Sequence, residues 1–246
     1  SQFQDAYIVC VRLTDHTLLW RRYLSSSLAD RNGGQFTEIV FDKGRLYVAD
    51  NLGAVACLAG QDGRLYWLRV LQDASRKIDA IGVGAFRVQS SWQAGAPARI
   101  DAGVLLPPQE PNASALLLDA DTGQIKETLK DALWQQAEYL VPVAGDLFGV
   151  GQTVARVDGA QREPIWQRHM TREEGIRPDG RACVTPARIV LPTSNRLLVL
   201  DTQTGKTLTE ASVSRPGNAV LVDGQIILTS GSTVRSFMDW AQVRRN

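Results

Sequence analysis

The chain repeats one short hairpin pattern, and this repetition restricts its fold more than any other feature of the sequence. Residues 116–129 read LLLDADTGQIKETL, in which an apolar run and a second short run flank a polar turn that ends at Gly123. Residues 197–209 repeat the pattern as LLVLDTQTGKTLT, with Gly205 in the same place. Apolar runs of strand length on both sides of a glycine turn are typical of a β-hairpin. Two near-copies of one hairpin indicate an internal repeat.

Three further segments align with these two without gaps when the turn residue is the reference. The five turn positions are His16, Gly63, Gly123, Arg162 and Gly205. The steps between them are about 40 to 60 residues, and a period near 40–45 residues is typical of propeller blades. We expect the glycines to need a positive φ in this turn.

Three columns of the alignment have a clear physical meaning. Five positions before the turn, every copy has an apolar residue: Val11, Leu58, Leu118, Val157 and Leu200. The next position is Asp in three copies (Asp119, Asp158 and Asp201), and an Asp that enters a tight turn accepts hydrogen bonds from nearby backbone N–H groups. Four positions after the turn, three copies have Trp (Trp20, Trp67 and Trp166), which we expect to pack between neighbouring repeats. We interpret these Asp, Trp and turn glycine residues as structural.

Each hairpin is preceded by further short apolar runs, so that each repeat has four predicted strands. Four antiparallel strands per repeat predict an all-β fold of the β-propeller type. The predicted propeller covers residues 1–238, with repeats near 7–22, 37–71, 98–130, 139–168, 182–211 and 218–238. The long step before Gly123 predicts an insertion at 73–97 that carries a loop and a strand of the third blade. Residues 239–246 are predicted to begin a helix, with Asp239 as its N-cap.

The pattern leaves two architectures open. The last repeat has three predicted strands and the first has two, so the chain is either a closed ring of about six blades or an arc of a ring with seven or eight. The chain begins at Ser1, which indicates either a processed or an excised start.

Composition excludes several classes of function. The net charge is +1, so no global positive field attracts nucleic acid or an anionic membrane. No apolar run approaches the roughly 18 residues of a membrane-spanning helix. The three cysteines, Cys10, Cys57 and Cys183, have no metal-type spacing, and we expect them to be reduced. Only two histidines are present, which limits catalysis by histidine.

The hairpins ending at Gly123 and Gly205, with the recurring Trp, resemble the repeats of pyrroloquinoline-quinone (PQQ)-type β-propellers. That family includes quinoprotein alcohol dehydrogenases and non-catalytic relatives, among them a propeller of outer-membrane assembly. Catalytic members hold the quinone with a vicinal disulfide and a calcium ion, but this chain has no adjacent cysteines. The resemblance therefore implies a non-catalytic branch, no cofactor and a location in the periplasm or otherwise outside the cytoplasm.

Five charged or titratable residues are candidates for contact with a partner. Arg156 stands in an apolar column, so it either points into the channel or pairs with a carboxylate. The others lie in a charged stretch that we expect to be a loop between blades: His169, Arg172, Glu173 and Arg177. No residue is assigned to catalysis, a cofactor or a metal.

The sequence favours a scaffold that binds another protein, or further domains of the same chain. One alternative is a quinoprotein-like dehydrogenase or sensor that binds PQQ in the central channel. A structural segment of a larger chain is a third hypothesis and is compatible with the first.

Overall fold

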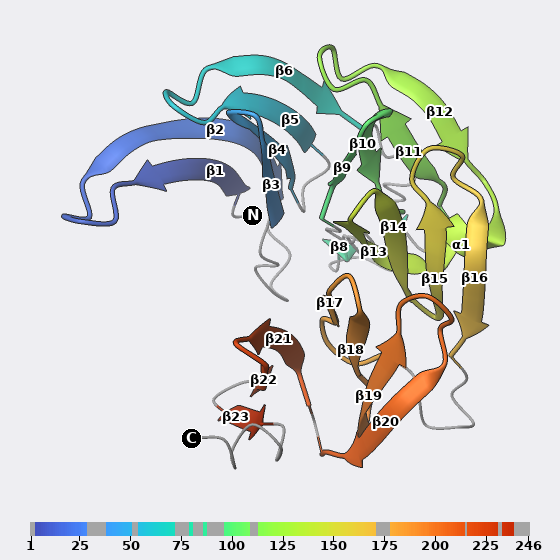
Figure 1. The fold of residues 1–246 in the computed structure, drawn as a ribbon. Helices are drawn as coiled ribbons and strands as arrows, with labels where there is room; N and C mark the ends of the chain where they lie inside the picture. The colour runs from blue at the N-terminus through green and yellow to red at the C-terminus, as the bar shows by residue number, and fades with distance from the viewer. Residues whose placement is uncertain are drawn as a thin grey trace. The chain divides into compact units, whose positions relative to one another are not determined.

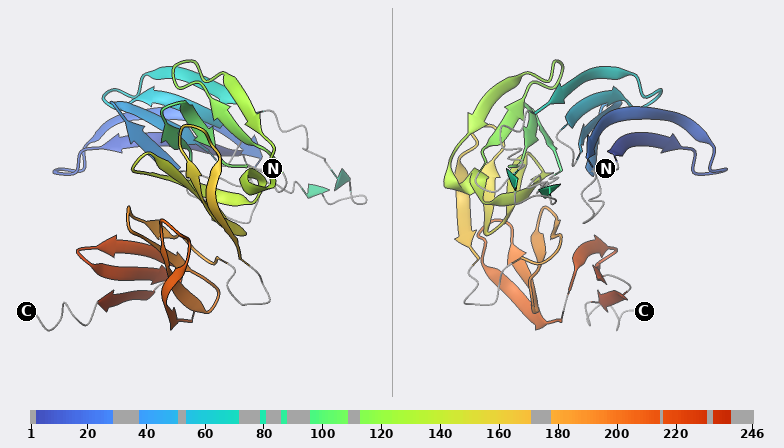
Figure 2. Two further views of the ribbon diagram at one scale, coloured as in Figure 1. Left: turned by 45° about the vertical axis from the view of Figure 1, so that its right-hand side comes forward. Right: turned by 180° about the vertical axis from the view of Figure 1, so that it is seen from behind.

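A computed structural model of the protein shows antiparallel β-sheets that follow one another along the chain (Figure 1). The structure describes residues 3–28, 38–50, 54–71, 79–80, 86–87, 96–108, 113–170, 178–214, 216–230 and 233–238. The chain divides into two compact units, Ser1–Gln135 and Gln136–Asn246. Figure 2 shows the twisted sheets of each unit from two further sides.

The first unit contains three repeats. Repeat 1 is a two-stranded sheet of β1 (Phe3–Val11) and β2 (Leu18–Leu28). Repeat 2 has the strand order β3-β4-β5-β6: β3 (Glu38–Asp42), β4 (Arg45–Ala49), β5 (Ala54–Ala59) and β6 (Leu65–Val70). Repeat 3 is built in the same order from β9 (Ala98–Ile100), β10 (Gly103–Leu106), β11 (Ala115–Leu118) and β12 (Ile125–Leu129).

The second unit also contains three repeats. Repeat 4 consists of β13 (Ala137–Val143), β14 (Asp146–Gly151), β15 (Thr153–Asp158) and β16 (Pro164–His169). Repeat 5 consists of β17 (Cys183–Val184), β18 (Arg188–Pro192), β19 (Arg196–Asp201) and β20 (Thr207–Ser212). Repeat 6 has three described strands: β21 (Asn218–Val222), β22 (Gln225–Ser230) and β23 (Thr233–Met238).

The hydrophobic core of each unit lies between neighbouring sheets. Between repeats 1 and 2, Ile8 and Leu24 form one buried cluster with Val48 and Leu58. Clusters of the same kind join repeat 2 to repeat 3, repeat 4 to repeat 5, and repeat 5 to repeat 6. Apolar side chains on both faces of a sheet are therefore buried wherever a repeat has a neighbour on both sides.

The structure confirms the predicted all-β propeller fold class and corrects two details. A short helix, α1 (Ala132–Gln135), was not predicted; it follows repeat 3 and buries Trp134, which is 2% exposed. The insertion at 73–97 lies mostly outside the described residues. It contains β7 (Asp79–Ala80) and β8 (Phe86–Arg87), which pair with each other, so the prediction that it supplies a strand of repeat 3 is wrong. The predicted helix at 239–246 lies outside the described residues.

Candidate functional site

The Asp residues that begin the hairpin turns bind the main chain. Asp119 Oδ1 accepts hydrogen bonds from the N–H groups of Asp121 and Thr122, at 3.0 and 2.9 Å, and from the Thr122 hydroxyl at 2.9 Å. Asp158 and Asp201 accept the equivalent bonds from the N–H groups two and three positions further on. The three carboxylates occupy equivalent positions in their repeats, and each stabilises its turn through the same hydrogen bonds to the backbone.

These hydrogen bonds stabilise the charged carboxylates. The pKa of Asp119 lies below its ordinary value, mainly because the Thr122 N–H donates to it. The pKa of Asp201 is lowered chiefly by the Thr204 hydroxyl. A carboxylate held in its ionised form at an exposed turn is poorly suited to act as a general acid near neutral pH.

All five turn residues adopt a left-handed backbone conformation. The φ angles are 56° for His16, 66° for Gly63, 68° for Gly123, 61° for Arg162 and 68° for Gly205. The turn itself therefore does not require glycine, since His16 and Arg162 accept the same conformation.

The glycines are explained by a Trp ring from the preceding repeat. The pairs are Trp20 with Gly63, Trp67 with Gly123 and Trp166 with Gly205. A Cβ atom added to these glycines would lie 2.5, 2.5 and 2.7 Å from the ring Cε3 atom, so no larger residue fits beneath the ring. Each indole N–H also donates to the carbonyl three residues before the glycine, at 3.2, 3.0 and 2.9 Å.

An arginine two residues after each Trp holds the same turn. Arg22 Nε and Arg69 Nε donate to the carbonyls of Gly63 and Gly123 at 2.8 Å, and Arg168 Nη1 donates to that of Gly205 at 3.4 Å. We call this paired contact of Trp and Arg with the next turn the Trp–Arg clamp. Sequence analysis missed its arginines, although the pattern Trp-x-Arg recurs in three copies.

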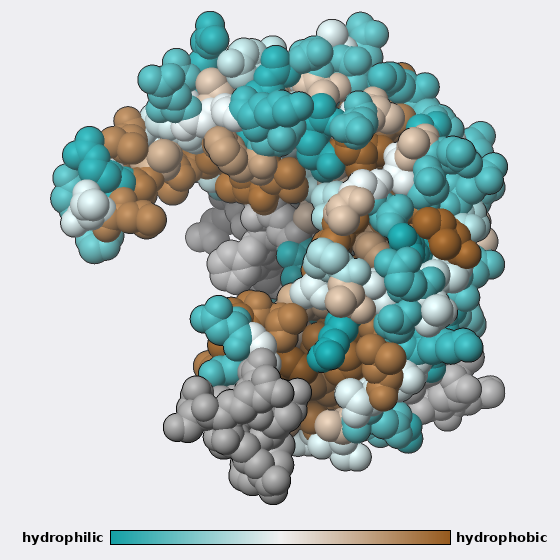
Figure 3. All heavy atoms as spheres, in the orientation of Figure 1, coloured by the Kyte–Doolittle hydropathy of each residue, from teal (hydrophilic) through white to brown (hydrophobic). Residues whose placement is uncertain are grey.

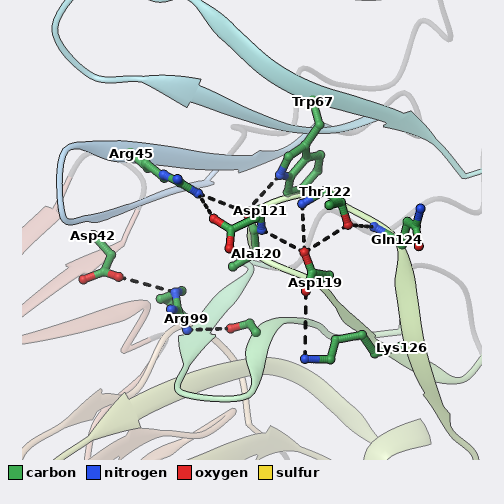
Figure 4. A network of polar contacts seen from close by, with 11 residues as sticks. Asp42, Arg45, Trp67, Arg99, Asp119, Ala120, Asp121, Thr122, Gln124 and Lys126 are labelled. Atoms are coloured by element: carbon green, nitrogen blue, oxygen red, sulfur yellow. Dashed lines mark hydrogen bonds and ion pairs between the residues drawn. The ribbon is translucent and has the colours of Figure 1, made fainter.

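Ion pairs extend the contact between repeats 2 and 3 (Figure 4). Arg45 Nη1 lies 2.5 Å from Asp121 Oδ1, at the turn that Trp67 covers. The pKa of Arg45 is raised mainly by its hydrogen bond with Asp121, while desolvation of the guanidinium acts in the opposite direction. Arg99 Nε of repeat 3 also lies 3.4 Å from Asp42 of repeat 2. Within repeat 3, Lys126 lies 4.0 Å from Asp119.

A cluster of arginine and tyrosine lies beside this ion pair. The guanidinium carbons of Arg45 and Arg64 lie 4.9 and 5.3 Å from the centre of the Tyr66 ring. Tyr66 is 44% exposed, and the Asp121 side chain is 75% exposed. We call Arg45, Arg64, Tyr66 and Asp121 the rim cluster. It places two cations against one accessible aromatic ring.

The structure decides between the two sequence-based alternatives for Arg156. Its Nη2 and Nε atoms lie 2.6 and 2.8 Å from Asp146 Oδ2, and Nη1 also donates to the side chain of Gln203 in repeat 5. The Arg156 side chain is 16% exposed. Arg156 therefore pairs with a carboxylate within its own sheet and links repeat 4 to repeat 5.

The placement of His169 in a loop is wrong. His169 is the last residue of β16, where it pairs with Thr153, and its Nδ1 atom lies 3.1 Å from the Thr153 hydroxyl. β16 extends to His169 because its backbone pairing with β15 extends to Thr153 and His169. The other three candidates, Arg172, Glu173 and Arg177, lie outside the described residues. Of the five candidates, the structure describes Arg156 and His169, which lie on the neighbouring strands β15 and β16.

Metal-binding sites, disulfides and membrane-spanning helices have no support in the described part of the chain. There, no group of three His, Cys, Asp or Glu side chains is placed to bind a metal ion. Cys10, Cys57 and Cys183 are free thiols. No helix among the described residues has the length and hydrophobicity needed to cross a membrane.

Nearly the whole chain matches a known protein family. A family model for the outer membrane protein assembly factor BamB matches residues 4–242. The chain belongs to the BamB family. No curated protein matches the chain.

Solved structures show that this fold is shared by proteins of different kinds. BamB from Moraxella catarrhalis is 13% identical, with a TM-score of 0.63 and coverage of 94% of this chain and 66% of that one. The computationally designed Ika8 protein is 13% identical, with a TM-score of 0.53 and coverage of 85% and 61%. A europium-containing methanol dehydrogenase is 10% identical, with a TM-score of 0.54 and coverage of 85% and 49%.

At these identities the similarities show the fold alone. This member of the BamB family spans about half to two-thirds of the length of those three structures.

Proposed function

We propose that the protein is a non-catalytic β-propeller scaffold that binds another protein during the assembly of outer-membrane proteins. The observation that carries the proposal is the BamB family match over residues 4–242. The protein acts in the periplasm or another compartment outside the cytoplasm. The propeller consists of residues 1–238, and the partner is a separate protein or a further domain of the same chain.

The rim cluster is the part of the described surface best suited to such a contact. Arg64 is exposed, and among the described residues no carboxylate lies within ion-pair distance of it. Its guanidinium stacks on Tyr66, so it is held in place while its N–H donors stay available for a partner carboxylate. Tyrosine and arginine are also the residues that contribute most to binding at protein interfaces.

This combination is particular to repeat 2. The residues one and three positions after the turn are Arg64 and Tyr66 there, whereas repeat 5 has Lys206 and Leu208. Repeat 5 keeps a cation and an exposed apolar residue but has no aromatic ring, which makes it a matched control. Arg156, His169, Arg172, Glu173 and Arg177 remain proposed as a second contact region.

The test is a reconstituted assembly reaction. Vesicles that carry purified outer-membrane assembly machinery, with its BamB subunit omitted, receive a urea-denatured β-barrel protein, and its folding is followed by protease protection. Adding this chain is expected to raise the folding rate. Variant Arg64→Glu/Tyr66→Ala should lose most of that gain, and variant Lys206→Glu/Leu208→Ala should keep it. A rate that does not respond to the wild-type chain would contradict the proposal.

A quinoprotein function is the second candidate, because a methanol dehydrogenase shares the fold. Native mass spectrometry after incubation with PQQ and Ca²⁺ separates the two. A bare polypeptide mass is the expected result. A mass increase equal to one quinone, with absorbance above the protein band, would favour the alternative.

A further inference from the structure

The outer strand of repeat 2 carries a row of exposed apolar side chains. In β6, Tyr66, Leu68 and Val70 are 44%, 42% and 63% exposed. They alternate with Trp67 and Arg69, which contact the turn of repeat 3, so the three exposed side chains lie on the opposite face of the sheet. We call Tyr66, Leu68 and Val70 the β6 row.

The β6 row is exposed although the neighbouring repeat on its side is present. Leu68 is paired with Ala56 of β5, and Ala56 lies in one buried cluster with Ile8 of repeat 1. The row and this cluster share one face of the sheet, because paired residues of adjacent strands point to the same side. Repeats 1 and 2 belong to the same unit. Repeat 1 therefore covers the middle of this face and leaves its outer strand accessible.

The equivalent positions of the other repeats do not form such a row. Five residues after the turn, where repeat 2 has Leu68, the other repeats have Arg21, Thr128, Gln167 and Glu210. Figure 3 shows mostly hydrophilic side chains over β12, the outer strand of repeat 3. A leucine in a column that is otherwise polar is not required by the fold of the repeat, and exposed apolar surface of this kind is typical of binding sites.

Arg64 adds a positive charge at one end of the β6 row. It is exposed, and its guanidinium carbon lies 5.3 Å from the centre of the Tyr66 ring. Among the described residues, no carboxylate lies within ion-pair distance of Arg64. The row therefore begins at a cation with available N–H donors and continues as apolar surface. A ligand that is complementary to both parts has a carboxylate beside an apolar stretch.

The spacing of the row favours an extended ligand. Side chains on one face of a strand recur about every 6.8 Å along the strand, and a second extended chain repeats with the same period. An amphipathic helix advances about 5.4 Å per turn, so its apolar side chains would not stay in register with the row. From Arg64 to Val70 the strand advances about 20 Å, which corresponds to an extended segment of about seven residues.

We propose that Arg64 and the β6 row bind an extended segment of the partner protein in which apolar residues alternate with polar ones and a carboxylate flanks them. The carboxylate pairs with Arg64, and the apolar side chains pack against Leu68 and Val70. This inference rests on the proposed function, because it specifies the part of the partner that the rim cluster contacts. Tyr66 belongs to both the rim cluster and the row, so the two surfaces are continuous.

The test measures binding of a fluorescent synthetic peptide to the full chain by anisotropy. The peptide alternates valine and threonine and has one glutamate at each end, so that it can pair with Arg64 in either direction. Leu68→Thr gives repeat 2 the polar residue of repeat 3 and should weaken binding by about tenfold, because the row loses apolar contact. Leu208→Thr makes the same change at an exposed leucine of β20 and should leave binding unchanged.

A second variant separates the carboxylate contact from nonspecific binding. Arg64→Gln should weaken binding of the glutamate peptide by about tenfold and should not change binding of a peptide with glutamine at both ends. Equal thermal unfolding of the variants and wild type confirms that these exposed substitutions leave the fold intact. A peptide that does not bind the wild type, or that binds Leu68→Thr or Arg64→Gln as tightly as the wild type, would overturn the proposal.

The peptide assay contains no assembly machinery, so it tests the β6 row separately from the proposed function. Peptide binding without any gain in the folding of a β-barrel protein would contradict the proposed function and leave the row supported. A gain in folding without peptide binding would contradict the role of the row and leave the proposed function supported.

Discussion

Replacing Gly123 by Ala tests whether the Trp ring, and not the turn, dictates glycine. The residue has a φ of 68°, and an added Cβ atom would lie 2.5 Å from Trp67 Cε3 and 2.6 Å from Cδ2. Both atoms belong to a rigid ring, so the ring has to move as a whole. Trp67 is 7% exposed and donates its indole N–H to the Ala120 carbonyl at 3.0 Å.

The expected loss of unfolding free energy in Gly123→Ala is the sum of three parts. A non-glycine residue in the left-handed region costs about 1 kcal/mol. Loss of the indole hydrogen bond costs about 1 kcal/mol. Partial loss of the packing of Trp67, whose complete removal is expected to cost about 3–5 kcal/mol, contributes roughly 1 kcal/mol more. We therefore expect Gly123→Ala to lower the free energy of unfolding by about 3 kcal/mol.

Gly44→Ala is the matched control. Gly44 has a φ of 80°, and an added Cβ would meet nothing within 4 Å, so the expected loss is about 1 kcal/mol from the backbone alone. Urea denaturation gives both values. In a Trp67→Ala background, Gly123→Ala should also cost only about 1 kcal/mol, because the ring is no longer there. Equal losses at Gly123 and Gly44, or an unchanged loss in the Trp67→Ala background, would refute the clash.

Three further experiments test other features of the structure. Arg69→Ala should lower the free energy of unfolding by about 1.5–3 kcal/mol, because it removes a charged donor to the Gly123 carbonyl. Arg64→Ala, which changes an exposed arginine outside the clamp, is the control. A loss at Arg69 as small as the loss at Arg64 would show that the clamp needs only Trp. The lowered pKa of Asp201 stabilises the folded state above its unfolded pKa of about 3.9, and this contribution is lost as the pH falls through the lower folded pKa. Asp201→Asn should therefore flatten the decline in melting temperature of the wild type below about pH 4, and parallel curves would contradict this. Burial raises the pKa of Cys57 to about 11, so a thiol reagent at about pH 8 should modify Cys10 well before Cys57, and mass mapping that finds Cys57 modified first would be the contrary result.

The sequence was sufficient for features that depend on neighbouring residues. Asp201 and Gly205 mark a turn whose hydrogen bonds join residues within five positions of each other, so their spacing alone indicates the hairpin. Alternating and continuous apolar runs likewise gave the strands and the repeat. His169 was misplaced because its charged neighbours are typical of a loop, while the ladder with β15 that holds it in a strand involves residues 16 positions earlier.

Only the tertiary structure decided which residues of different repeats meet. Trp67 was recognisable as a residue that packs, but its contact with Gly123 joins positions 56 apart in the printed sequence, and no local rule connects them. Arg156 was an anomaly in an apolar column until the structure paired it with Asp146. Val11 reads like Leu58 in sequence, and only the packing of the sheets shows that one is exposed and the other buried. Local hydrogen bonding and alternation are fixed by the order of the residues, whereas the faces that are covered depend on how whole sheets pack against each other.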